Sequence, residues 1–209
     1  RFIVPILLEA DYPGRRSEET CFVFPFDHDL RNANDSFNDI SEKLRSLDYP
    51  LLFLLNIKEI SFEISGVLGL YGKKVEEKRG FGSTTAEFIK LTQNDGVNRD
   101  DLYDNLLWLF SRINEKGHRY SVGFFVDPEG RLIPKAHPAF CFFPTKEVTG
   151  LNFIIHAPFL LNDSREGIRA GVQHNIDMIS LLSELAADSL NCLKEIGLTK
   201  KVPLIDDNI

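Results

Sequence analysis

The stretch Leu161-Asn162-Asp163-Ser164-Arg165-Glu166 lies where an apolar, strand-like run gives way to a long helical pattern. Downstream of it, apolar residues recur at the spacing of one helix face, and Gly197 follows as a stop signal. The members of this apolar stripe are Ile168, Val172, Ile176, Ile179, Leu182, Leu185, Leu190 and Leu193. We therefore predict a helix over residues 165–196, with a capping box formed by Asp163 and Glu166 at its start.

Arg165 is an unusual residue for the first turn of a helix. Backbone N–H groups there have no partner, and the helix macrodipole disfavours a cation by about 0.3–1 kcal/mol. An anion is favoured at the same place, so the N–H groups and the guanidinium together suit a phosphate. The alternative is that Glu166 neutralises Arg165 on an ordinary solvated turn. The hexapeptide alone leaves both interpretations open.

Two further stretches precede the hexapeptide: Phe140-Cys141-Phe142-Phe143-Pro144-Thr145 and Thr149-Gly150-Leu151-Asn152-Phe153-Ile154-Ile155-His156-Ala157-Pro158-Phe159. Together they resemble chaperone-like ATPases related to sacsin, and the hexapeptide resembles the middle domain of the ninety-kilodalton heat-shock chaperone family. These proteins have a nucleotide site of the GHKL type, named after gyrase, chaperone, histidine kinase and mismatch-repair ATPases. In the chaperone family an arginine at this place reaches the γ-phosphate of ATP held in a separate N-terminal domain.

The resemblance implies that Arg165 is the catalytic residue and that it contacts the γ-phosphate from outside the nucleotide-binding domain. It also implies that Asn162 and Ser164 help to fix the loop. Arg169 stands where the chaperone family often has a glutamine. A second polar contact to the nucleotide could therefore be kept, moved or replaced in this chain.

A second resemblance lies near the N-terminus. Thr20 and the apolar run over residues 21–26 are similar to the closing strand of a GHKL ATPase domain, where a threonine before the strand often lies near the nucleotide base. Glu19 takes the place of the glycine that is usual there. The alternative is a threonine that simply begins a strand.

The predicted elements give an α+β fold, in which a β-sheet packs against helices. By resemblance this is the two-layer, ribosomal-protein-like α/β sandwich of chaperone middle domains, ending in a long helix. We expect residues 1–31 to be tail strands of a GHKL-type ATPase domain, and residues 32–56 to be a connecting helix and crossing segment. Residues 57–199 would form the middle domain and residues 200–209 a frayed tail.

Two helices are predicted before the long one, over residues 35–47 and 98–113, from apolar residues at helical spacing. Strands are predicted within residues 2–8, 21–26, 57–93, 120–126, 131–133, 140–143 and 151–155. The strands 120–126 and 131–133 are expected to form a hairpin across a tight turn at Asp127-Pro128-Glu129-Gly130. The charged run over residues 73–79 is interpreted as a solvated hairpin end. The glycine-rich residues 80–84 lack the lysine and the spacing of a P-loop, so a β-turn is predicted there.

The composition argues against several classes of protein. Of the 209 residues, 43% are hydrophobic and 26% are charged, as in ordinary globular domains, and the net charge of −7 disfavours nucleic-acid binding. No apolar run approaches the roughly 20 residues that span a bilayer. Three widely spaced cysteines indicate neither a disulfide framework nor a zinc site, so we expect a cytoplasmic setting. The apolar segment directly after Arg1, without a signal-peptide pattern, predicts a piece of a longer protein.

The sequence lacks the motifs of a self-sufficient ATPase. It contains no Asp-x-Gly-x-Gly stretch, no helix with the paired asparagine and carboxylate, no nucleophile elbow and no His-Glu-x-x-His pattern. Asp27-His28-Asp29 has no partners at ligand spacing, so no metal site is predicted. His156 lies in an apolar run and is expected to be a hydrogen-bonded core or edge residue. ATP and Mg²⁺ are therefore expected in the intact parent protein, and neither is expected to be bound by this chain alone.

Three functions compete on this basis. The first, which we adopt, is a fragment of a chaperone-like GHKL ATPase that supplies Arg165 and couples ATP binding and hydrolysis to conformational change. Its expected partners are the upstream ATPase domain, a protein client and a second copy of the parent protein. The second is a non-catalytic interaction module that binds a client or partner chain, with Arg165 only structural. A free-standing enzyme is the third, and the absence of catalytic motifs disfavours it.

Overall fold

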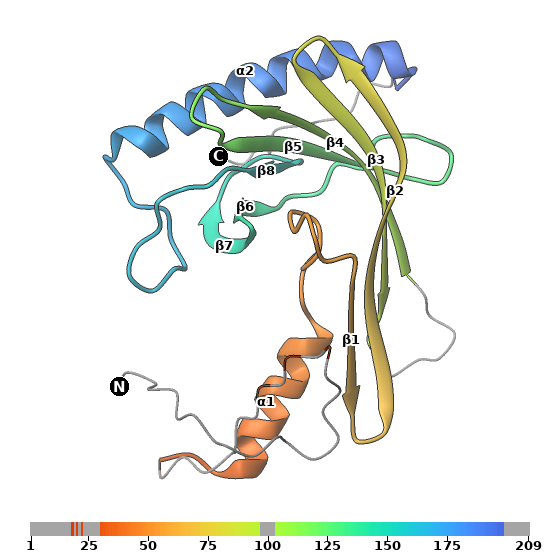
Figure 1. Ribbon diagram of the computed structural model, residues 1–209, viewed down its shortest axis with the longest axis vertical. Coiled ribbons are helices and arrows are strands. Elements are labelled where there is room, and N and C mark those ends of the chain that lie inside the picture. The colour runs from red at the N-terminus through yellow and green to blue at the C-terminus, as the bar shows by residue number, and fades with distance from the viewer. Residues whose placement is uncertain (1–17, 19, 21, 23–29, 97–102, 199–209) are drawn as a thin grey trace. The chain divides into compact units, whose positions relative to one another are not determined.

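The computed structural model describes residues 18, 20, 22, 30–96 and 103–198 of the chain. The chain forms two compact units, residues 1–42 and residues 43–209. In its described part it is an α+β protein with a mixed eight-stranded sheet and a long C-terminal helix (Figure 1). The elements are α1 (Ala33–Arg45), β1 (Glu59–Ile64), β2 (Val67–Phe81), β3 (Thr84–Asn94), β4 (Tyr103–Ile113), β5 (Arg119–Val126), β6 (Pro138–Cys141), β7 (Phe143–Val148), β8 (Ile154–His156) and α2 (Gln173–Ile196).

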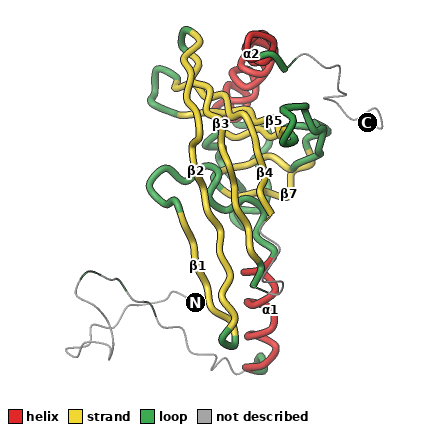
Figure 2. Tube along the Cα trace, turned by 90° about the vertical axis from the view of Figure 1, so that its right-hand side faces the viewer, coloured by secondary structure: helices red, strands yellow, loops and turns green. Residues whose placement is uncertain are grey.

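The strand order in the sheet is β1-β2-β3-β4-β5-β8-β6-β7. The first five strands form an antiparallel meander, and the long strands β2, β3 and β4 run side by side (Figure 2). β8 then enters between β5 and β6, pairing antiparallel with β5 and parallel with β6. This late insertion brings His156 beside Phe140 and Ser121, which come from two other strands.

Both faces of the sheet are covered near its centre. The face that carries Trp108 and Phe110 packs against α2, whose Met178 and Leu185 belong to the same apolar cluster. The opposite face, which carries Leu107 and Leu109, is covered by residues 49–53. Side chains alternate between the two faces of a strand, so each cover buries a different set of residues.

The helix predicted over residues 98–113 is wrong in its described part, because residues 103–113 form β4. Positions 107–111 of this strand are all buried, since α2 covers one face and residues 49–53 the other. A strand that is buried on both faces shows a continuous apolar run in place of alternation. Such a run also contains apolar residues at helical spacing, so periodicity alone could not separate the two structures.

The charged run over residues 73–79 lies inside β2, and its interpretation as a hairpin end is corrected. β1 pairs with residues 67–72 and the Lys73 N–H bonds the Lys58 carbonyl, so beyond Lys73 no described strand pairs with the outer side of β2. Charged side chains and a bulge between Val75 and Glu77 protect this edge from pairing with another chain. The turn predicted in the glycine-rich stretch is confirmed at Gly82, where φ is +58°.

The helix predicted over residues 165–196 begins later, at Gln173, so the capping box of Asp163 and Glu166 is also wrong. Val172 occupies the N-cap position without a side-chain hydrogen bond. The predicted stop is confirmed, because Gly197 adopts the left-handed conformation with φ of +96° and its N–H donates to the carbonyl of Lys194.

The buried face of α2 differs from the predicted apolar stripe. Ile176, Ile179 and Leu190 are exposed, whereas Asn175 is buried. The side chain of Asn175 accepts the N–H of Leu160 at 2.8 Å and donates to the carbonyls of Leu160 and Arg169 at 2.9 and 2.8 Å. These polar bonds to the segment before the helix help to set its rotation, which hydrophobic spacing does not reveal.

The remaining predictions are confirmed in part: the predicted strand 140–143 is divided between β6 and β7, and only the last two residues of the predicted strand 151–155 belong to β8. α1 lies two residues before its predicted bounds, and the turn over residues 127–130 is closed by the N–H of Gly130 on the carbonyl of Asp127 at 2.9 Å. Only Leu132 of the predicted strand 131–133 pairs, through a bridge to Val126. The predicted strand over residues 2–8 and the tail at 200–209 lie outside the described residues, as does the run 21–26 apart from Phe22. Among the helices of the described part, none is long and apolar enough to cross a membrane.

Two buried histidines contact the segment 49–53. The His156 ring stacks on Phe53 with ring centroids 4.0 Å apart, and the His137 ring meets Tyr49 edge-on at 5.7 Å. Three ring nitrogens have no hydrogen-bond partner among the described residues: Nδ1 and Nε2 of His156, and Nε2 of His137. Burial lowers the pKa of His156 to about 3 and that of His137 to about 4. The burial expected for His156 is therefore confirmed, whereas the hydrogen bond expected for its ring is not found among the described residues.

We expect acid to destabilise this unit through the two histidines. In the unfolded chain their pKa is about 6.5, so above about pH 6.5 both histidines are neutral in either state and the free energy of unfolding is not reduced. As the pH drops towards 4, the unfolded chain binds protons that the folded chain does not, and the free energy of unfolding falls by up to about 1.4 kcal/mol per pH unit for each histidine. His156→Phe should reduce this slope by about half while keeping the stack on Phe53. Urea unfolding between pH 7 and pH 5 measures the slope, and His174→Gln serves as the histidine control. An unchanged slope in His156→Phe would contradict the assignment.

Candidate functional site

Arg165 lies in a closed loop, residues 161–168, between β8 and α2. A bridge between Leu161 and Ile168 closes the base of the loop. Two backbone bonds add to it, from the Asn162 N–H to the Gly167 carbonyl at 2.9 Å and from the Arg169 N–H to the Leu160 carbonyl at 2.9 Å. The prediction that Arg165 stands in a helical first turn is thus wrong, and the loop resembles a short hairpin.

Asn162 organises this loop from within. Its Oδ1 atom accepts the hydroxyl of Ser164 at 2.9 Å and the N–H groups of Glu166 and Gly167 at 3.2 Å each. Its backbone carbonyl accepts the N–H of Arg165 at 2.9 Å. The N–H groups that the sequence was expected to leave free for a phosphate are therefore already bonded within the loop. What remains for a ligand is the side chain of Arg165.

The loop is also attached to the edge strand β7, beside which it runs in Figure 1. The N–H of Lys146 donates to the carbonyl of Glu166 at 2.6 Å, and the N–H of Ile168 donates to the Glu147 carboxylate at 2.9 Å. The Lys146 ammonium pairs with the Glu166 carboxylate at 2.8 Å. Glu166 thus neutralises Lys146, and the alternative in which it neutralises Arg165 is corrected.

Gly167 leaves room for two side chains where the loop meets β7. A Cβ atom at this position would lie 2.9 Å from Nδ2 of Asn162 and 2.9 Å from the Glu147 carboxylate. A larger residue at this position would therefore displace the side chains of Asn162, which organises the loop, and of Glu147, which attaches it to β7. Gly167 was predicted inside a helix, and its actual role is to let these two side chains approach.

Arg165 has a strained backbone and an unpaired side chain. Its φ of +59° places it in the left-handed region, which costs a residue with a Cβ atom roughly 1–2 kcal/mol. The side chain is exposed, and its guanidinium forms no ion pair or hydrogen bond with any residue that the structure describes. Strain of this kind persists only where the surrounding structure fixes it, and it is often found at functional sites.

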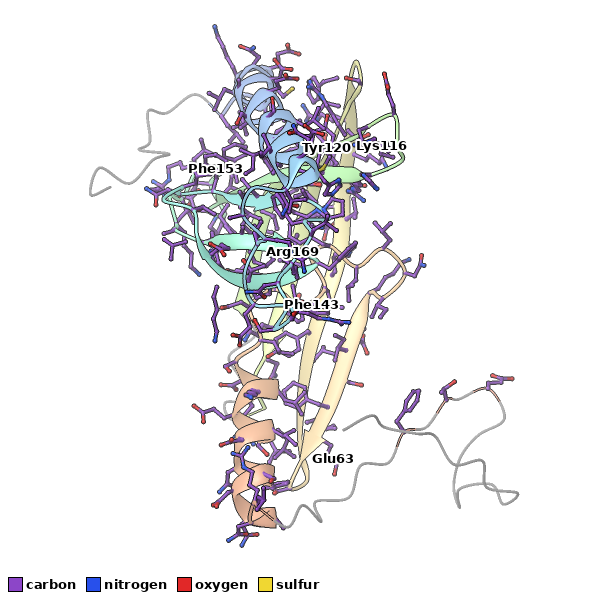
Figure 3. All side chains as sticks on the ribbon, turned by 90° about the vertical axis from the view of Figure 1, so that its left-hand side faces the viewer. Glu63, Lys116, Tyr120, Phe143, Phe153 and Arg169 are labelled. Atoms are coloured by element: carbon purple, nitrogen blue, oxygen red, sulfur yellow. The ribbon has the colours of Figure 1, made fainter. Side chains whose placement is uncertain are left out.

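The structure brings four of the five predicted site residues together. Asn162, Ser164 and Arg165 share the loop, and Arg169 lies just past its base, where Figure 3 labels it. The Arg169 guanidinium forms a long ion pair of 3.4 Å with the exposed Asp163. Thr20 is an exposed residue outside any helix or strand, in the unit formed by residues 1–42.

Sequence reasoning missed Glu147 as a loop anchor. Its carboxylate bonds a backbone N–H that lies twenty-one positions further along the chain. No local pattern announces such a contact, because a glutamate on a strand edge is ordinarily a solvated residue. The same holds for Lys146, whose ion pair with Glu166 spans twenty positions of the chain.

Comparison of the chain with models of protein families, with curated proteins and with solved structures finds no match. Within residues 30–96 and 103–198, no three His, Cys, Asp or Glu side chains lie together in a way that could hold a metal ion. The function is therefore inferred from the loop itself and from the residues around it.

We expect Asn162→Ala to loosen the loop without unfolding the sheet, because one side-chain oxygen accepts three of the loop's hydrogen bonds. The amides of Glu166 and Gly167 should exchange with solvent at least about tenfold faster, since each lost bond contributes roughly 0.5–1.5 kcal/mol. Asn162→Asp keeps the acceptor oxygen and should preserve slow exchange. Hydrogen exchange followed by NMR or mass spectrometry compares the variants, and equal exchange in Asn162→Ala and the unaltered protein would contradict the proposed role of Asn162.

Proposed function

We propose that this chain is part of a chaperone-like GHKL ATPase, in which Arg165 contacts the γ-phosphate of ATP bound by a separate, upstream domain. The observation that carries the proposal is the exposed, unpaired guanidinium of Arg165 on the strained position of an anchored loop. In this proposal the α+β unit corresponds to the two-layer middle domain of such a protein. ATP and Mg²⁺ belong to the upstream domain of the parent protein, which would act in the cytoplasm.

The chemistry of the loop supports a contact supplied from outside the nucleotide site. An arginine that stabilises the charge on a transferring phosphoryl group raises hydrolysis by about 10³–10⁵-fold in known cases. Its planar guanidinium is always charged and can form two parallel hydrogen bonds to phosphate oxygens. Because no carboxylate of the described residues pairs with Arg165, no ion pair of that part of the chain must be broken before it reaches a phosphate.

The rigidity of the loop supports the same role. A catalytic cation is effective when its position is fixed before the substrate arrives, since the cost of ordering it is then avoided. Asn162 fixes the loop from within, and Glu147 attaches it to β7. Asn162 and Ser164 act here as positioning residues, because the polar atoms that hold the loop are bonded to one another.

Arg169 is the candidate for a second phosphate contact. Its partner Asp163 is fully exposed and the ion pair is long, so the interaction is weak in water. A phosphate with two negative charges would compete with this carboxylate for the guanidinium. Arg169 would then take the place of the glutamine that the chaperone family often has after the arginine-bearing turn.

A second candidate function is a protein-interaction module, and one observation favours it. Phe142 and Phe143 are 45% and 51% exposed where β6 turns into β7. Phe142 has a φ of +64°, which is strained for an aromatic residue. Exposed aromatic side chains are enriched where proteins bind one another. In this case a client or partner chain would cover the two rings and Arg165 would be structural only.

We expect Arg165→Ala to abolish ATP hydrolysis by the parent protein, lowering kcat by about 10³-fold or more. ATP affinity should stay within a few-fold, because the nucleotide is held by the upstream domain. Arg131→Ala is a matched control, since Arg131 is an exposed arginine on the turn after β5 that pairs with Asp127 and Glu129. Steady-state hydrolysis and nucleotide titration measure both quantities. Unchanged turnover in Arg165→Ala would exclude the coupling role and favour the interaction module.

Arg165→Gly separates function from folding. Glycine adopts positive φ without strain, so the variant loses the backbone strain of roughly 1–2 kcal/mol at this position. This gain in folding stability offsets the loss that comes from the greater conformational freedom of glycine in the unfolded chain. We expect the melting temperature to stay the same or rise while hydrolysis by the parent protein is lost. Thermal unfolding and ATP turnover are measured on the same preparation. A clear drop in melting temperature would mean that the Arg165 side chain stabilises the loop, in contradiction to its proposed role.

A further inference from the structure

A polar region occupies one end of the sheet face that residues 49–53 cover. The apolar part of this face, around Ile89 and Leu109, lies under that cover. Further along β3 and β4 the same face carries Glu87 and Ser111. A polar surface in the middle of a sheet is costly unless it is bonded or serves a ligand, since apolar residues would pack there more cheaply.

A cleft of about 280 Å³ opens over this polar region. The residues used below line it from four neighbouring strands and the β2–β3 turn: Lys78, Ser83, Thr85, Glu87, Ser111 and Arg119. Its size is just below the range of small-molecule pockets, roughly 300–1,000 Å³, so it would hold a phosphate with a small organic group.

The cleft has more cations than carboxylates. Lys78 and Arg119 both pair with Glu87, at 3.1 and 3.0 Å, so one positive charge is left without a counter-charge among the residues that line the cleft. The pKa of Glu87 is lowered by these two cations in spite of its partial burial, so the carboxylate is ionised at neutral pH. Arg112 also lines the cleft, but its guanidinium bonds Asp188 and Thr84.

The field of Arg119 extends beyond the cleft. Burial lowers the pKa of Lys73 on β2, and the charge of Arg119 lowers it further. The same two causes lower the pKa of His156 on β8. Glu87 raises the pKa of Lys73 and so opposes part of this effect. The case for an anion therefore rests on the two cations and the one carboxylate that meet in the cleft.

The donors in the cleft are more numerous than a carboxylate ligand could use. Arg119 donates through Nη2 to Glu87 and to Ser111 at 3.0 Å each, while its Nε and Nη1 groups bond no described residue. The hydroxyls of Ser83 and Thr85 also bond no side chain of the described residues. A phosphate group offers three or more acceptor oxygens and about two negative charges at neutral pH, which fits these donors better than the two oxygens of a carboxylate.

We propose that this cleft binds a phosphate group, either free or carried on a small phosphate ester. Arg119 and Lys78 supply the charge, and the hydroxyls of Ser83 and Thr85 supply further hydrogen bonds. The proposal is independent of the role of Arg165, because the cleft is built on β2 to β5 and the Arg165 loop is attached to β7. In the strand order β8 and β6 lie between the two places.

The test is calorimetric titration of the full-length protein with inorganic phosphate and, separately, with glycerol phosphate. A non-hydrolysable ATP analogue is present throughout, so that any nucleotide site is already filled. Lys78→Gln is compared with Lys74→Gln, a matched control on the same strand. Both lysines are largely exposed and both pair with one glutamate, but Lys74 does not line the cleft. Thr85→Val removes one hydroxyl without changing side-chain size.

We expect saturable binding that weakens about tenfold in Lys78→Gln and several-fold in Thr85→Val, with less than about a twofold change in Lys74→Gln. Tighter binding of the ester would identify a phosphate ester as the ligand, and equal binding would identify the phosphate group alone. The proposal is overturned if neither compound binds saturably, or if both lysine variants lose affinity equally, which would indicate general charge attraction. Loss of ATP hydrolysis in Arg165→Ala has no bearing on this result.

Discussion

Burial of the central strands on both faces is the constraint on which the rest of this structure depends. α2 covers the face that carries Trp108 and Phe110, and residues 49–53 cover the face that carries Leu107 and Leu109. The helix and the crossing segment therefore have to lie where they do, because the apolar area they bury supplies the dominant stabilisation. Polar and charged groups that a ligand could reach then occur where a cover ends, at the polar cleft and at the β7 edge.

The Arg165 loop shows how a loop that carries an exposed side chain can be held in place without being buried. The loop is exposed, and its order comes from hydrogen bonds made by Asn162 and from its attachment to β7 through Glu147. These bonds also overcome the cost of the left-handed backbone at Arg165. The helix behind it begins only at Gln173, so a helix macrodipole plays no part in presenting the arginine.

The α+β class and several turns were predictable from the sequence. The errors arose where the structure depends on contacts that the local hydrophobic pattern does not show. The turns at Gly82 and Gly130 and the helix end at Gly197 depend on a few neighbouring residues, and their positions were predicted. β4 was predicted as a helix because its apolar run reflects two separate covers that come from distant parts of the chain. The start of α2 was placed too early because the hydrogen bonds of Asn162 within the loop, together with the long-range bond of Glu147, draw residues 161–168 out of the helix.

The sequence by itself determined the α+β class, the main turns and the presence of an arginine at a strand-to-helix junction, because these depend on spacing and on local backbone preferences. Only the tertiary structure decided that the N–H groups beside Arg165 are bonded, that Glu166 pairs with Lys146, and that Lys78 and Arg119 meet over Glu87. The ion pairs of Glu166 and of Glu87 join residues from different strands and loops. Their partners are chosen by the register of the sheet, which is a property of the whole fold and not of any short stretch.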